Sequence, residues 1–182
     1  MKIKDNRMLT LAWHAVAAFY QARAVADLMM ALKLTDNDAR AAILYGAFVG
    51  YYSRPFMPSK ELGSLPEGVV PKSSRSLHQR MLTDRKQIFL HTDANAEIPG
   101  ITSVNHLRMV VLPTKQLRVH TVAPVPKAAV FQQYCDLLDL LYEDINSAIQ
   151  LYIDDRMDEP LPGPGSYILN IEGDRLHLVP EE

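Results

Sequence analysis

Two long runs of apolar residues at helical spacing open the chain. In the first, from about Asp5 to Lys33, apolar side chains recur every three or four residues, and neither proline nor glycine interrupts them. That pattern predicts a long amphipathic helix with one face in a core. The second run, from about Asp38 to Ser53, is apolar nearly all round. Because a helix of that kind is buried on most sides, we expect it to be covered by the bundle and by a second copy of the chain.

Proline and glycine separate the second helix from a third. Residues 55–72 contain four prolines and two glycines, which predicts a long surface loop. Ser73 or Ser74 can then cap a third helix, which we expect to continue through a polar run that holds Arg85 and His91.

The period of the pattern changes from helix to strand in two later segments. At about 106–121 apolar and polar side chains alternate on both sides of a turn, which predicts a β-hairpin. At about 166–180 two apolar-rich runs flank Glu172-Gly173-Asp174, which predicts a second hairpin. Between them, residues 128–155 return to helical spacing. We therefore predict one mainly α-helical domain over residues 1–182. It is a bundle of four to five helices over about 5–155, with the first hairpin inserted and the second as a C-terminal extension.

The composition is that of an ordinary folded protein, with 48% hydrophobic and 22% charged residues among 182. A single cysteine, Cys135, excludes an internal disulfide and is expected to be a small core residue in a reducing compartment. The N-terminus lacks the pattern of a secretory signal. Apolar stretches such as Ala41 to Tyr52 are too short or too interrupted to span a bilayer. We expect a cytoplasmic protein without a membrane partner.

The formal net charge of −2 hides an uneven distribution. Residues 71–127 contain nine basic and three acidic side chains, whereas the rest of the chain contains ten basic and eighteen acidic ones. A basic middle favours a phosphate-rich partner such as RNA. Charges scattered over a solvated surface are the equally open alternative.

Arg85 and His91 are the candidate catalytic pair. Arginine holds a phosphate with a planar fork of donors, and histidine takes or gives a proton near pH 7. At about 100° per residue the two side chains lie about 120° apart around one helix. Convergence across a two-fold axis between two protomers therefore suits them better than a site within one. Asp84 or Asp93 can orient His91; the alternative is an ordinary helix end, where the dipole favours a histidine.

The stretch Asp84-Arg85-Lys86 followed by His91-Thr92-Asp93, with Tyr51-Tyr52-Ser53-Arg54-Pro55 after the second helix, resembles the HEPN superfamily. The likeness is to its abortive-infection branch and covers roughly residues 5–155. It implies a helical bundle that forms a homodimer, with the Arg–His motifs of two protomers meeting in one cleft. It also implies metal-independent cleavage of RNA, in a toxin–antitoxin or phage-defence setting, and a cognate antitoxin such as a nucleotidyltransferase-like protein.

Three further basic residues are candidates to bind RNA phosphates in such a site: Arg54, Arg80 and Lys86. Tyr52 is a candidate to orient the site together with the two aspartates. No group of histidine, cysteine or carboxylate residues has the spacing of a metal site, and no glycine-rich loop leads into a helix. The sequence therefore predicts neither a metal nor a cofactor.

Lys86 departs from the family pattern, because active members usually have Asn, Asp or His directly after the arginine. Two hypotheses follow. The first is a metal-independent endoribonuclease of the toxin or phage-defence kind, which the Arg85 and His91 pair and the basic middle favour. The second is a non-catalytic HEPN-like dimeric module that binds a partner protein or a nucleotide, which Lys86 and the mild net charge favour.

Overall fold

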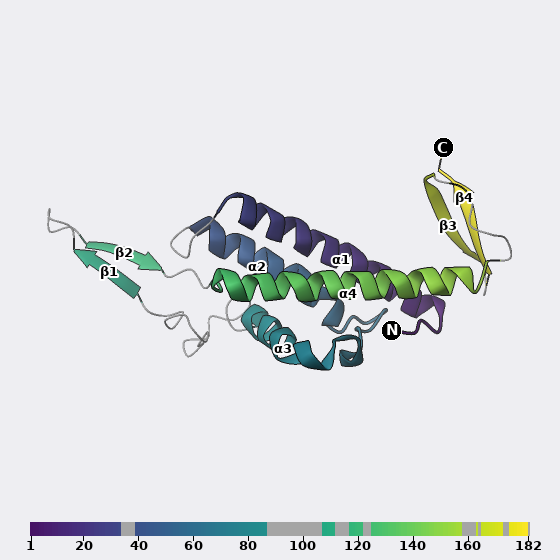
Figure 1. The fold of residues 1–182 in the computed structure, drawn as a ribbon, viewed down its shortest axis with the longest axis horizontal. Helices are drawn as coiled ribbons and strands as arrows, with labels where there is room; N and C mark the ends of the chain where they lie inside the picture. The colour runs from purple at the N-terminus through teal and green to yellow at the C-terminus, as the bar shows by residue number, and fades with distance from the viewer. Residues whose placement is uncertain are drawn as a thin grey trace.

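The computed structural model describes residues 1–33, 39–86, 107–111, 117–121, 125–157, 163, 165–172 and 175–181. Four α-helices dominate this part of the chain (Figure 1): α1 (Asn6–Ala31), α2 (Ala39–Ser53), α3 (Arg75–Asp84) and α4 (Ala128–Asp154). Three short 3₁₀ turns lie between α2 and α3: η1 (Arg54–Phe56), η2 (Glu67–Val69) and η3 (Lys72–Ser74). Two separate antiparallel hairpins complete it: β1 (Leu107–Val111) with β2 (Leu117–Thr121), and β3 (Tyr167–Glu172) with β4 (Arg175–Pro180).

The predicted mainly α fold is confirmed, and so are both hairpins, with Leu107 opposite Thr121 in the first and Leu169 opposite Leu178 in the second. Asp5 caps α1, where its carboxylate accepts a hydrogen bond from the Met8 N–H at 2.7 Å. The expected side-chain cap on α3 is wrong. Ser74 occupies the N-cap position but makes no capping hydrogen bond, because the η3 turn leads directly into the helix.

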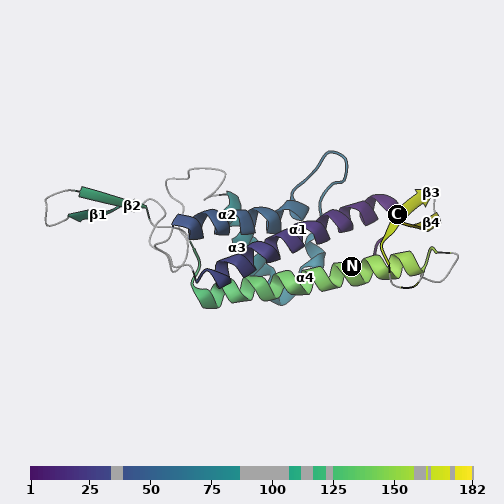
Figure 2. The same ribbon diagram turned by 90° about the horizontal axis from the view of Figure 1, so that it is seen from above.

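The helices form a layered bundle in which α1 packs against both α2 and α4, and α3 packs against α2 (Figures 1 and 2). α1 and α4 are antiparallel, and the Tyr152 hydroxyl donates to Asn6 Oδ1 at 3.0 Å across their ends. Alanine fills most of the buried face of α1, which lets the neighbouring helices approach closely. The alanines with 0 or 1% exposure are Ala12, Ala15, Ala18, Ala22 and Ala26.

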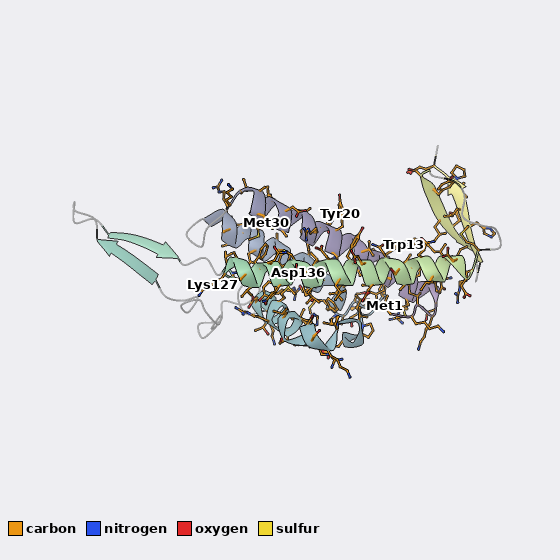
Figure 3. All side chains as sticks on the ribbon, in the orientation of Figure 1. Met1, Trp13, Tyr20, Met30, Lys127 and Asp136 are labelled. Atoms are coloured by element: carbon orange, nitrogen blue, oxygen red, sulfur yellow. The ribbon has the colours of Figure 1, made fainter. Side chains whose placement is uncertain are left out.

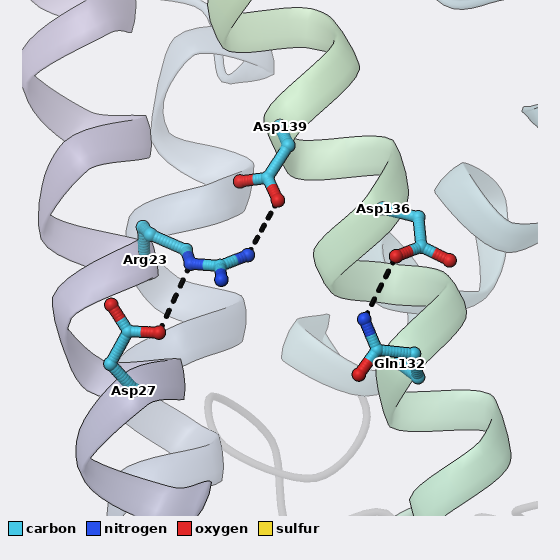
Figure 4. A network of polar contacts seen from close by, with 5 residues as sticks. All are labelled: Arg23, Asp27, Gln132, Asp136 and Asp139. Atoms are coloured by element: carbon cyan, nitrogen blue, oxygen red, sulfur yellow. Dashed lines mark hydrogen bonds and ion pairs between the residues drawn. The ribbon is translucent and has the colours of Figure 1, made fainter.

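An ion-pair network on the outer surface also joins α1 to α4 (Figure 4). The Arg23 guanidinium contacts Asp27 on its own helix at 3.1 Å and Asp139 on α4. These side chains are about one third to one half exposed. Because solvent screens such pairs, each contributes about 0–1 kcal/mol, and the aromatic and aliphatic core between the helices supplies most of the stability.

The two hairpins lie at opposite ends of the bundle (Figures 1 and 2). Leu176 of β4 is 2% exposed and belongs to the same core as the helices, so this hairpin is anchored to the bundle. Within the described ranges, no helix is both long enough and apolar enough to cross a membrane.

The predicted burial of α2 holds for most of its large apolar residues but not for Ile43. Tyr45, Phe48 and Val49 have no exposed surface, whereas Ile43 is 71% exposed. Tyr20 on α1 is 66% exposed and points away from the bundle (Figure 3). The fold therefore leaves single large apolar side chains on its outer surface.

Candidate functional site

Arg85 lies directly after the last α-helical residue of α3. The α-helix ends at Asp84, and Arg85 and Lys86 form a wider turn of the π type. Turns of this type often occur at functional sites. The expected continuation of the helix from Arg85 to His91 falls outside the described residues, so the angle of about 120° between the two side chains stays a prediction.

The Arg85 side chain is half-buried, whereas Lys86 is exposed. Arg85 Nη1 donates to the thioether sulfur of Met57 at 3.1 Å, and a thioether is a weak acceptor. Within the described ranges no carboxylate pairs with this guanidinium. His91 and Asp93 lie outside the described residues, so their positions relative to Arg85 stay a prediction.

Met57 also lines a pocket of about 230 Å³ on the side of the molecule formed by α1, η1 and residues 59–63. Arg54 lines the same pocket, and its side chain is exposed. Met57 therefore contacts one predicted site residue, Arg85, and lines a pocket together with another, Arg54. Arg85 does not itself line the pocket, and a cleft shared by Arg85 and His91 stays a prediction.

Asp84 faces inward rather than toward solvent. It is 4% exposed, and its Oδ2 accepts a hydrogen bond from the Tyr45 hydroxyl of α2. Burial raises the pKa of Asp84, while the Tyr45 hydrogen bond and the Arg80 charge oppose that rise. Burial also raises the pKa of Tyr134 on α4, to about 12, with the nearby Asp84 charge acting in the same direction. Asp84, Tyr45, Tyr134 and the half-buried Arg80 thus form a buried polar cluster where three helices meet.

Tyr52 is likewise part of the core. Its hydroxyl lies 2.9 Å from Nδ1 of His78, which is 2% exposed, and the two residues are fixed between α2 and α3. The ring of Phe56 packs edge-on against the His78 imidazole, with centroids 4.5 Å apart. Burial lowers the pKa of His78, with the Glu67 charge opposing, and raises the pKa of Tyr52. Burial therefore favours the neutral form of His78, because its charged form would lose hydration.

The sequence did not single out Tyr45, His78 or His14, which are the partners and neighbours of the predicted site residues. The sequence spacing of these residues is compatible with two of the contacts, Tyr45 with Asp84 and Tyr52 with His78. Tyr45 and Tyr52 are seven residues apart on α2, and His78 and Asp84 are six apart on α3, so antiparallel packing of these helices pairs them in order. His14 has no such signal, because it reaches the pocket only through the packing of α1 on η1.

Within the residues that the structure describes, no three histidine, cysteine or acidic side chains converge as a metal site does. No known family model matches the chain. No curated protein and no solved structure matches it either. The site therefore has to be interpreted from its own chemistry.

Proposed function

We propose that the protein is a HEPN-like metal-independent endoribonuclease of the toxin or phage-defence kind, with Arg85 and His91 acting together on an RNA phosphodiester. The observation that carries the proposal is the state of Arg85. Its guanidinium is half-buried at a helix end, beside a pocket, with a thioether and no carboxylate as its polar neighbour among the described residues. A partly desolvated cation without a counter-charge favours a bound anion, and its planar fork matches phosphate oxygens.

The reaction needs one group that moves protons and one that stabilises charge. The ribose 2′-oxygen attacks the adjacent phosphorus while His91 removes its proton. Arg85 stabilises the negative charge that builds on the phosphorane-like state. The bond from phosphorus to the 5′-oxygen then breaks, and that oxygen takes a proton. The products are a 2′,3′-cyclic phosphate and a 5′-hydroxyl end.

The proposal includes a homodimer in which the motifs of two protomers share a groove. The support is the open side of α2. Ile43 is 71% exposed on a helix whose other large apolar side chains are buried or half-buried, and a second protomer would cover it. A two-fold axis would place two copies of Arg85 and His91 along one groove.

The second candidate is a non-catalytic HEPN-like module that binds a partner protein, such as a cognate antitoxin, or a nucleotide. One observation favours it. Asp84 and Tyr52, two of the three side chains predicted to orient His91, already hydrogen bond to Tyr45 and His78 in the core. Asp93 would then have to hold the imidazole alone.

Incubation of the purified protein with total RNA in EDTA tests the proposal. We expect cleavage by the wild type and none by His91→Ala, with His177→Ala as a matched control because His177 is an exposed histidine on β4. Arg85→Lys should also lose activity, because lysine lacks the bidentate fork. The matched control is Arg75→Lys, at the exposed start of the same helix. An inactive wild type would favour the binding module.

A further inference from the structure

The pocket between α1, η1 and residues 59–63 combines basic groups with a small volume. At about 230 Å³ it is smaller than the roughly 300–1,000 Å³ of sites for drug-sized molecules, so it suits a compact group. Its polar lining consists of His14, Arg54 and Ser59. Leu11, Leu62 and Met57 are among the apolar residues that complete it.

The outer wall of the pocket is held by backbone hydrogen bonds. Ser59 and Gly63 exchange two of them, each at 3.0 Å, and the Leu65 N–H donates to Pro55 O at 2.8 Å. Ser59 Oγ accepts from the Leu62 N–H at 3.0 Å, which leaves its own O–H as a donor. A wall closed in this way is already in place before any ligand arrives, which lowers the entropy cost of binding.

A second arginine, Arg7, lies beside Gly63, which lines the pocket. The φ of +80° at Gly63 is unfavourable for other residues, and a β-carbon added there would lie 3.2 Å from Nη2 of Arg7. Glycine suits this turn, and a larger residue there would also require the Arg7 guanidinium to shift by a few tenths of an ångström. Arg7 is exposed and comes from the first turn of α1, one face of which also contributes His14.

No described carboxylate neutralises these groups. The side chains of Arg7, Arg54 and His14 make no ion pair or hydrogen bond with another described residue. Glu61 is exposed on the same turn but does not line the pocket, and Asp5 is engaged with the Met8 N–H.

A larger pocket of about 660 Å³ near the N-terminus differs in this respect. Its Arg156 is paired with Asp155 at 3.0 Å and stacks on the Tyr152 ring at 3.8 Å. Lys2 and Lys4 also line the larger pocket, but the carboxylate of Asp155 lies among these basic groups. No described carboxylate lines the smaller pocket, which is therefore the better candidate for an anionic ligand.

We propose that this smaller pocket binds a phosphate group, with Arg54 and Arg7 supplying charge and His14 and Ser59 supplying directed hydrogen bonds. The proposal rests on the proposed function only in taking RNA as the source of the phosphate. Because Met57 both lines the pocket and contacts Arg85, an RNA strand bound at Arg85 would bring a neighbouring phosphate to the pocket. The pocket would then hold the strand without taking part in cleavage.

Binding of an eight-nucleotide, fluorescently labelled, 2′-O-methylated RNA tests this, because such RNA cannot be cut through its 2′-oxygen. Anisotropy is measured between 50 and 200 mM salt. We expect Arg54→Gln to weaken binding about tenfold and to reduce the slope of log K against log salt by about 0.7, as for one lost phosphate contact on a single strand. Arg7→Gln should act in the same direction with a smaller effect.

Lys33→Gln is the matched control. It also removes one positive charge, but Lys33 lies beyond the opposite end of α1 from Arg7, past the labelled Met30 (Figure 3). Twenty-six helical residues rise about 39 Å, several times the Debye length of about 8–10 Å. Lys33→Gln should therefore leave both the affinity and the salt slope nearly unchanged. Melting curves establish that each variant is folded.

A second arm distinguishes the source of the phosphate. Inorganic phosphate and 5′-AMP are titrated while the amide signals of Ser59, Leu62 and Gly63 are followed by NMR. Chemical-shift changes of these amides with phosphate or 5′-AMP that disappear in Arg54→Gln support a site for free phosphate groups. If only RNA binding depends on Arg54, the pocket is a site for the RNA backbone. The proposal is overturned if neither ligand responds, or if the pocket variants bind as Lys33→Gln does. If RNA binding depends on Arg54 but the protein cuts no RNA, the proposed nuclease activity is wrong and the proposed phosphate site holds.

Discussion

Removal of the Tyr45 hydroxyl should destabilise the protein measurably. Tyr45 has no exposed surface, and its hydroxyl donates to Asp84, which is 4% exposed. A buried hydrogen bond that involves a charged group contributes about 1.5–3 kcal/mol, and loss of the donor leaves the carboxyl poorly satisfied. We expect Tyr45→Phe to lower the free energy of unfolding by that amount. For a chain of this size the melting temperature would then fall by roughly 3–12 °C.

Urea denaturation at pH 7 measures this effect. Tyr20→Phe is the matched control, because it deletes the same atom from a side chain that is 66% exposed, and it should change the stability by less than about 0.5 kcal/mol. If Tyr45→Phe costs no more than Tyr20→Phe, the contact with Asp84 does not stabilise the fold and the buried polar cluster is incorrectly described.

The loss of unfolding free energy in Tyr45→Phe should also depend on pH, and the ionisation of Asp84 decides the direction of that dependence. Burial raises the pKa of Asp84 in the folded state, so this group destabilises the fold as pH rises through that pKa. The Tyr45 hydroxyl favours the ionised form and opposes the rise. Tyr45→Phe should therefore cost more at pH 7 than at pH 4, and Asp84→Asn should remove that difference. A cost that is independent of pH would show that the hydroxyl does not act on the carboxylate.

Three further perturbations test the fold and the assembly. Burial lowers the pKa of His78 below its ordinary value of 6.5, so its contribution to stability is present above about pH 6.5 and is lost as pH falls; His78→Gln should flatten the decline in unfolding free energy between pH 7.5 and 5. Leu138→Ala, at a position with no exposed surface, should cost about 2–5 kcal/mol in urea denaturation, whereas Leu151→Ala, at 70% exposure, should cost little. Light scattering should give a dimer mass at high micromolar concentration for the wild type and a monomer mass for Ile43→Glu; a wild-type monomer would contradict the dimer.

The helices and hairpins were predictable because their signals are local. The apolar spacing of α1 continues from its cap at Asp5, and the break after α2 coincides with Arg54 and Pro55, which form the η1 turn. Alternation predicted the first hairpin, and two runs on either side of a Glu-Gly-Asp turn predicted the second; both form in the structure. In each case the residues that decide the structure are close together in the sequence.

The surroundings of the candidate site were not predictable in the same way. The contacts of Tyr45 with Asp84 and of Tyr52 with His78 join residues 39 and 26 positions apart. They depend on the packing of α3 against α2, which no local pattern specifies. Aspartate usually lies at the protein surface, yet tertiary packing buries Asp84. The pocket likewise combines His14 of α1 with Arg54 of η1 and with the turn at Gly63, where a positive φ favours glycine.

The ends of the RNA products test the central claim most directly. A synthetic RNA is incubated with the protein in EDTA, and the cut ends are analysed by mass spectrometry. We predict a 2′,3′-cyclic phosphate and a 5′-hydroxyl from the wild type, and no product from His91→Ala, whose melting temperature should match the wild type. Product that persists in His91→Ala, or that forms only when magnesium is added, would contradict the assignment of proton transfer to His91 and charge stabilisation to Arg85.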